Sequence, residues 1–72
     1  MNNLLTITAI DRDSSDTMSR TFSTESPELF MEAVEKFESE LSYRKYELIT
    51  NDMIEDYSEE IINILDELLI TN

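Results

Sequence analysis

Hydrophobic and polar residues alternate along the first third of the chain. This period of two predicts β-strands over residues 4–10 and 17–23. On the first strand, one face carries Leu5, Ile7 and Ala9, and the other carries Leu4, Thr6, Thr8 and Ile10. The six residues between the strands are mostly Asp and Ser, whose side chains bond to nearby backbone and favour turns. We therefore expect an antiparallel β-hairpin closed by a polar loop at residues 11–16.

The hydrophobic period changes to that of an α-helix after residue 26. Ser26, Pro27 and Glu28 are typical of a helix start, because Ser caps, Pro fits the first position and an acid suits the positive end of the helix dipole. This helix is predicted over residues 27–41. Its apolar stripe consists of Phe30, Ala33, Val34, Phe37 and Leu41.

The pattern is ambiguous over residues 43–50, which fit either a short third strand or an extended loop. A second helix is predicted over residues 53–69, with Asp52 as its N-cap and Glu55 at the acidic position of a capping box. Its apolar stripe consists of Ile54, Tyr57, Ile61, Leu65 and Leu68. The whole pattern predicts one α+β domain, in which a β-hairpin packs on two amphipathic helices.

Composition narrows the possible chemistry. The chain has 72 residues and contains no Cys, His, Trp or Gly. Without Cys and His there is no thiolate nucleophile, no disulfide and no imidazole base or ligand, so we expect neither an enzyme nor a cofactor. Asp11, Asp13 and Ser15 are spaced like the start of a calcium loop. The motif then fails, because Asp16 and Phe22 occupy the positions that need Gly and Glu, and weak surface binding of a cation is the remaining alternative.

Size and hydropathy bear on location and assembly. No apolar run approaches the roughly 18 residues of a membrane span, and residues 1–7 lack the pattern of a signal peptide. We expect a cytoplasmic protein that does not bind membranes. Because a domain this small is marginal alone, a homodimer is a reasonable expectation. Its seam would be Ile62, Leu69 and Ile70, unless the sheet and the first helix cover them.

Charge is the strongest signal in the sequence. Five Lys and Arg stand against 17 Asp and Glu, which gives a net charge of −12, and no basic residue follows Lys45. Solubility alone needs a net charge of only about 2 to 8 in a small domain. The acids that we expect to form a binding surface are Asp52, Glu55, Asp56, Glu59, Glu60, Asp66 and Glu67, together with Glu28, Glu32 and Glu35 of the first helix.

A helix that carries acids three, four and seven residues apart presents them at rises of about 4.5, 6 and 10.5 Å. These rises bracket the separation of neighbouring phosphates along a DNA strand. A basic groove that binds DNA would attract such a face over long range. The pattern therefore favours a DNA mimic, and the alternative interpretation is a solvated helix face in a generally acidic protein.

In size, in charge and in the acidic face formed by Asp52, Glu55, Asp56, Glu59 and Glu60, the chain resembles small acidic inhibitors from phages and mobile elements. Anti-CRISPR proteins, antirestriction proteins and uracil-DNA glycosylase inhibitors are of this kind. The resemblance covers no specific motif and transfers no residue role. It implies a non-enzymatic inhibitor of a host nucleic-acid-binding protein, such as a Cas nuclease, in the cytoplasm of the host cell. Such an inhibitor binds no nucleic acid itself. An acidic homodimeric adaptor or regulatory module is the alternative.

Overall fold

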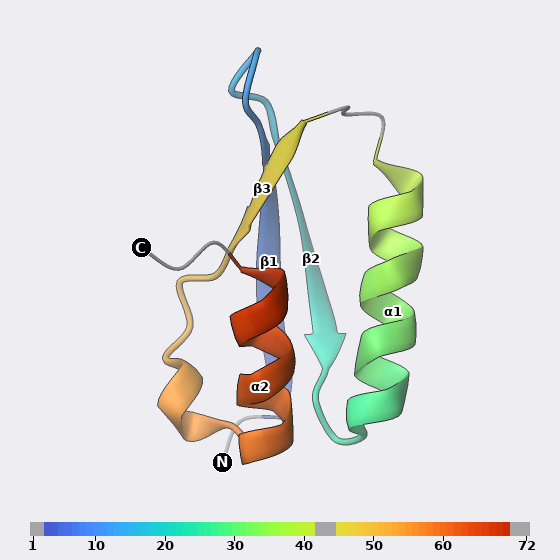
Figure 1. Cartoon of the computed structure of the whole chain (residues 1–72), viewed down its shortest axis with the longest axis vertical. Coiled ribbons are helices and arrows are strands. Elements are labelled where there is room, and N and C mark those ends of the chain that lie inside the picture. Colours follow the sequence, from blue (N-terminus) through green and yellow to red (C-terminus); the bar gives the residue numbers. More distant parts are fainter. Residues whose placement is uncertain (1–2, 42–44, 70–72) are drawn as a thin grey trace.

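The computed structural model describes residues 3–41 and 45–69, which form a three-stranded antiparallel sheet with helices packed on one face (Figure 1). The elements in chain order are β1 (Leu4–Asp11), β2 (Thr17–Ser23), α1 (Pro27–Glu40), β3 (Tyr46–Ile49), the 3₁₀ turn η1 (Ile54–Asp56) and α2 (Glu59–Leu68). The predicted α+β fold is confirmed. In Figure 1, α2 lies across β1 and α1 lies beside β2.

The N-terminal strand is central, because the sheet order is β2-β1-β3. The predicted hairpin of β1 and β2 is present, and its register places Leu5 opposite Phe22. On its other side β1 pairs antiparallel with β3, with Ala9 opposite Leu48. The ambiguity over residues 43–50 is thus resolved as a strand at Tyr46–Ile49, while residues 43 and 44 lie outside the described part.

The loop between β1 and β2 turns without glycine. Ser15 adopts a left-handed conformation with φ of 65°, and its N–H donates to the Asp11 carbonyl at 2.9 Å. The Asp11 carboxylate accepts from the Asp13 N–H at 2.9 Å and from Ser14 Oγ at 3.0 Å. The hydrogen bond from Asp13 is the main reason that the pKa of Asp11 is lowered. The spacing that begins like a calcium loop therefore serves the turn itself.

The core lies between the sheet and the helices. Its buried members are Leu5, Ile7, Ala9, Phe22, Phe30, Val34, Phe37, Leu48, Tyr57, Ile61 and Leu65. The ring of Phe22 meets those of Phe30 and Phe37 edge to face, with centroids 5.9 and 5.7 Å apart. Four predicted stripe residues are only half-buried and pack at the edge of this core: Ala33, Leu41, Ile54 and Leu68.

The apolar flank of α2 packs largely within the domain. Ile62 and Leu69 are half-buried and contact the core cluster. This packing favours the alternative in which the domain covers the flank, over a dimer seam at this place. The third residue of the expected seam, Ile70, lies outside the described part.

The beginning of the first helix is as predicted. Ser26 Oγ accepts a hydrogen bond from the Leu29 N–H at 3.4 Å, and Pro27 is the first helical residue. The helix ends at Glu40, one residue before the predicted end.

The prediction that the second helix begins at residue 53 is wrong, because α2 begins at Glu59. Tyr57 is extended, with φ of −101° and ψ of 167°, and it separates η1 from α2. The N-cap is Ser58, whose Oγ accepts from the Ile61 N–H at 3.4 Å. Asp52 is not a cap, since its carboxylate accepts from the Thr6 N–H in β1 at 2.9 Å. Residues 50–57 are instead held against β1 by hydrogen bonds that involve the side chains of Thr50, Asp52 and Tyr57.

Candidate functional site: the acidic helical surface

All ten acids predicted to form a binding surface are exposed. They lie in four places along the chain. Asp52 precedes η1; Glu55 and Asp56 are in η1; Glu59, Glu60, Asp66 and Glu67 are in α2; Glu28, Glu32 and Glu35 are in α1. Because η1 and α2 are separate, four of the seven acids expected on the second helix lie on it. The predicted helix over residues 53–69 would have carried these acids on one element, and the structure instead divides them between η1 and α2.

Asp52 is exposed, but its carboxylate also forms a hydrogen bond that stabilises the fold. Beyond the end of β3, Thr50 Oγ1 donates to the Thr6 carbonyl at 2.7 Å, and Asp52 accepts from the Thr6 N–H. Further along, the Tyr57 hydroxyl donates to the Leu4 carbonyl at 2.7 Å. Side chains thus continue the hydrogen bonding of β1 where strand pairing stops. The sequence signal Thr50-Asn51-Asp52, read as a helix cap, actually marks this closure of the β1 edge.

The densest group of acids is Glu55, Asp56, Glu59 and Glu60, which we call the η1–α2 cluster. Two of these residues occupy the 3₁₀ turn and two occupy the first turn of α2. The positive end of the α2 dipole favours Glu59 and Glu60 at that position. Among residues 3–41 and 45–69, the cations that form ion pairs are Arg12 and Arg20, and neither pairs with this cluster. The cluster therefore keeps its charge uncompensated by close cations in the described part of the chain.

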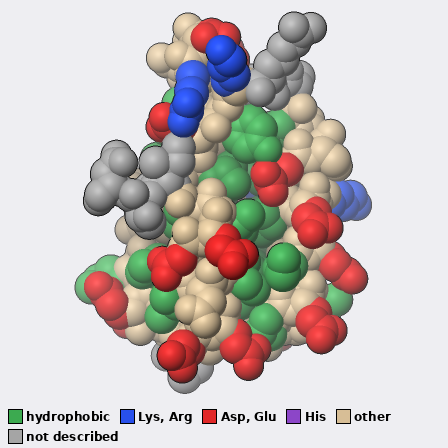
Figure 2. Space-filling view, in the orientation of Figure 1, with side chains coloured by type: hydrophobic (Ala, Val, Ile, Leu, Met, Phe, Trp, Pro, Cys, Tyr) green, Lys and Arg blue, Asp and Glu red, His purple; other side chains and the backbone are tan. Residues whose placement is uncertain are grey.

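The two paired arginines neutralise acids that lie elsewhere. Arg12 Nε lies 3.2 Å from Glu47 Oε1, at the end of the sheet near the β1–β2 loop. Arg20 of β2 pairs with Glu40 of α1, and its guanidinium lies 5.0 Å from the Phe37 ring centroid. Figure 2 shows most of the visible Lys and Arg at the loop end of the molecule and acids spread over the helical face. The charge is therefore unevenly distributed along the molecule.

Hydrophobic side chains are interspersed with the acids on the same face (Figure 2). Leu29, Met31 and Met53 are exposed to 66%, 43% and 67%. A partner that covers this face would meet apolar contacts among the carboxylates. None of these three residues is among those that the sequence predicts for the binding surface.

A hydrogen bond between an acid and a tyrosine joins α1 to β3. The Tyr46 hydroxyl donates to Glu38 Oε2 at 2.6 Å. This bond, with smaller contributions from desolvation and from the negative charge of Glu38, raises the pKa of Tyr46. The bond fixes β3 to the helical layer close to the acidic surface.

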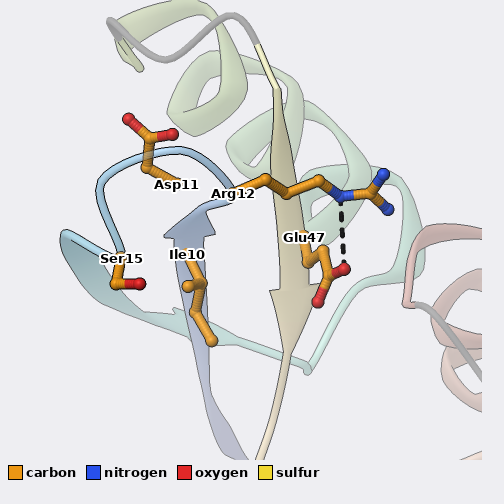
Figure 3. A pocket seen from close by; sticks show the side chains of 5 residues that line it. All are labelled: Ile10, Asp11, Arg12, Ser15 and Glu47. Carbon is orange, nitrogen blue, oxygen red and sulfur yellow. Dashed lines mark ion pairs between the residues drawn. The ribbon is translucent and has the colours of Figure 1, made fainter.

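An open depression of about 450 Å³ lies at the loop end of the sheet (Figure 3). It is lined by Ile10, Asp11, Arg12, Ser15 and Glu47. Its charged groups already have partners, because Arg12 pairs with Glu47 and Asp11 holds the turn. These contacts account for the charged side chains of the depression without a ligand.

Within residues 3–41 and 45–69, no three acidic side chains converge in a way that would hold a metal ion. None of the helices there is long and apolar enough to cross a membrane. Comparisons of the chain with protein-family models, curated proteins and solved structures found no match.

Proposed function

We propose that the chain is a non-enzymatic inhibitor that binds the basic nucleic-acid-binding surface of another protein, as an acidic DNA mimic. The most concrete target is a Cas nuclease in the host cytoplasm, as for an anti-CRISPR protein encoded by a phage. Such an inhibitor requires no cofactor and contacts neither nucleic acid nor a membrane. It works by occupying the surface that DNA would use.

The observation that carries this proposal is the η1–α2 cluster, four exposed acids within six residues. In the described part of the chain the paired arginines contact Glu47 and Glu40, so neither forms an ion pair with this cluster. The other exposed acids of α1 and α2 extend the negative potential over the helical face. A basic groove that excludes water would bind such a surface more strongly than solvent-exposed ion pairs would suggest.

The physical basis is electrostatic attraction at long range followed by close pairing. Complementary potentials raise the association rate well above that of neutral surfaces. Each charge pair left at a wet rim is worth about 0–1 kcal/mol. Removing one partner of a desolvated pair costs about 2–5 kcal/mol. Neutralising the cluster should therefore have a large effect only if the cluster enters the groove.

The test begins with capture of bacterial proteins on the immobilised chain at low salt. Each captured protein is then purified and its binding to a short DNA duplex is measured with and without this chain. The proposal expects the chain and the duplex to exclude each other, and the affinity for the chain to fall steeply with added sodium chloride. Simultaneous binding of chain and duplex would contradict it, as would the absence of any DNA-binding protein among those captured.

The location of the site is tested by two variants of equal charge. One carries Glu55→Gln, Glu59→Gln and Glu60→Gln; the control carries Asp13→Asn, Asp16→Asn and Glu25→Gln. Each changes the net charge from −12 to −9, and all six side chains are exposed. We expect the first variant to lose about tenfold or more in affinity and the control to lose much less. Equal losses would show that net charge, and not the cluster, determines binding.

A further inference from the structure

The outer edge of β2 is unpaired in the described part of the chain. Hydrogen bonds from the Asp11 N–H to the Asp16 carbonyl and from the Thr24 N–H to the Asn3 carbonyl fix which residues face β1. Since the pattern repeats every two residues, the intervening residues point their backbone groups away from β1. These outward residues are Thr17, Ser19, Thr21 and Ser23. All four are exposed, so the edge is accessible along its whole length.

The opposite edge of the sheet is formed by β3, which has four residues against seven in β2. Where β3 no longer pairs with the central strand β1, the side chains of Thr50, Asp52 and Tyr57 bond to Thr6 and Leu4. In the described part of the chain, no strand pairs with the outer edge of the longer strand β2. Natural proteins usually protect a long edge strand with charges, a proline, a bulge or a neighbouring segment. The edge strand β3 is short, whereas β2 is longer, has no proline and carries one charged side chain, Arg20, so the β2 edge is the stronger candidate for an interface.

The β2 edge is also the place where a second acidic chain meets least repulsion. No acid occurs from Thr17 to Thr24, and Arg20 lies at the centre of the strand. The side chains along the edge are neutral and already held in register. Thr6 bonds to Thr21 through their hydroxyls at 2.8 Å, and a Thr8–Ser19 bond of 2.7 Å repeats the arrangement. A strand that docks here would meet a regular row of uncharged Ser and Thr side chains.

One stripe of α1 lies on the β2 side of the helical layer. Leu29, Ala33, Lys36 and Glu40 recur at helical spacing, and Glu40 is fixed to Arg20 of β2 by their ion pair. Leu29 is 66% exposed and Ala33 is half-buried. Lys36 is the single cation of α1. The stripe therefore offers a small apolar contact and a positive charge next to the open edge.

We propose that a second copy of this chain docks on β2, antiparallel strand to strand, to form a continuous six-stranded sheet. In the self-complementary register, Ser19 pairs with Thr21 of the second copy and Thr17 pairs with its Ser23. All outward backbone groups of both strands are then satisfied. Arg20 lies on the two-fold axis, where the ion pair with Glu40 offsets its repulsion from its symmetry mate. The α1 stripes of the two copies approach each other across the same axis.

The first test measures mass by sedimentation equilibrium over a range of protein and salt concentrations. We expect a reversible dimer at twice the 8.4 kDa of one chain. Added sodium chloride should strengthen it, because screening weakens repulsion between copies of charge −12. This salt response is opposite to that of the proposed inhibitor–target complex, so the two proposals fail separately. A monomer at every concentration would overturn the dimer and leave the inhibitor proposal standing.

A charge variant tests the location. Ser19→Glu with Thr21→Glu places glutamates directly opposite each other in the dimer. The control, Asn51→Glu with Asn63→Glu, adds the same charge at exposed positions away from β2. We expect the dissociation constant of the dimer to rise about tenfold or more in the first variant and by much less in the control. Equal effects would overturn the assignment to β2.

Cross-linking tests the register and does not depend on how well the glutamate variant folds. Because the chain has no cysteine, every disulfide reports an introduced thiol. Directly opposed residues lie about 5.5 Å apart between Cα atoms, within the range that a disulfide bridges. An oxidised mixture of Ser19→Cys and Thr21→Cys chains should therefore yield mainly the mixed dimer. A statistical mixture of dimers, or no cross-link at all, would overturn the register.

Discussion

At the scale of single residues, side chains supply hydrogen bonds to the backbone of β1 that strand pairing does not provide. Strand β3 has four residues, whereas β1 has eight, so part of the β1 edge lacks a strand partner on that side. For the backbone of Thr6, Thr50 provides a donor and Asp52 provides an acceptor. Buried or half-buried backbone groups are costly when they have no partner. Asp52, which the sequence suggests is a surface charge, thus also stabilises the fold.

Asp52→Ala should lower the free energy of unfolding by about 1 kcal/mol, because the Thr6 N–H loses its acceptor. Asp52→Asn keeps a carbonyl oxygen at the same place and should cost less. Urea denaturation of the three proteins measures the differences. If alanine and asparagine were equally mild, the hydrogen bond to Thr6 would contribute little to stability.

The bond between Tyr46 and Glu38 makes stability depend on alkaline pH. The raised pKa of Tyr46 means that the folded state holds the phenolic proton more tightly than the unfolded chain does. Its contribution is complete below the ordinary tyrosine pKa of about 10 and is lost as pH rises through the folded value. We expect the free energy of unfolding to decline as the pH rises above about 10, and less steeply in Tyr46→Phe. Parallel declines in both proteins would assign the alkaline sensitivity to other groups.

At the scale of elements, the segment between β3 and α2 decides the shape of the acidic surface. Tyr57 is buried, and its hydroxyl reaches the Leu4 carbonyl of β1. This contact requires an extended backbone, which ends η1 and forces α2 to begin again at a new cap. The carboxylates of η1 and of α2 consequently lie on two short elements that differ in direction.

The new cap is Ser58, and Ser58→Ala should lower the free energy of unfolding by about 1 kcal/mol. Ser58→Asp should retain most of the stability, because an aspartate also caps and suits the positive end of the dipole. Thermal denaturation followed by circular dichroism compares the variants. An unchanged stability in Ser58→Ala would mean that the Ile61 N–H has another acceptor of equal strength.

The hairpin and the first helix are predicted well because their signals are local. Alternation along residues 4–10 and 17–23 and the cap at Ser26 act within a few residues of each other. The interactions that determine where α2 begins are not local, since Asp52 and Tyr57 bond to β1 more than 45 residues away. The exposure of the ten acids follows from their chemistry, whereas their grouping depends on these distant contacts.

At the scale of the whole molecule, charge opposes compactness. Seventeen acids stand against five bases, and two ion pairs join the described residues. The repulsion among the unpaired carboxylates lowers the stability of the folded state. Salt weakens repulsion between exposed charges, since the Debye length falls from about 10 Å at 0.1 M to about 3 Å at 1 M.

The melting temperature should therefore rise by several degrees when sodium chloride is increased from low to moderate concentration. A gain of about 1 kcal/mol corresponds to about 4–8 °C for a domain of this size. The variant with Asp13→Asn, Asp16→Asn and Glu25→Gln, which removes three exposed acids outside the helices, should melt higher at low salt and respond less to salt. A melting temperature that is flat or falls with salt would show that the carboxylates are compensated locally.

The sheet order β2-β1-β3 also shapes how the chain folds. The first strand, β1, is central and needs a partner on each side. Pairing with β2, its neighbour in sequence, supplies only one of the two. The hairpin joins residues close along the chain, whereas β3 joins β1 across a span that includes all of α1, for example Thr8 with Ile49. Closing that longer loop costs more entropy. The hairpin and α1 are therefore expected to form the folding nucleus, with β3, η1 and α2 closing onto it afterwards.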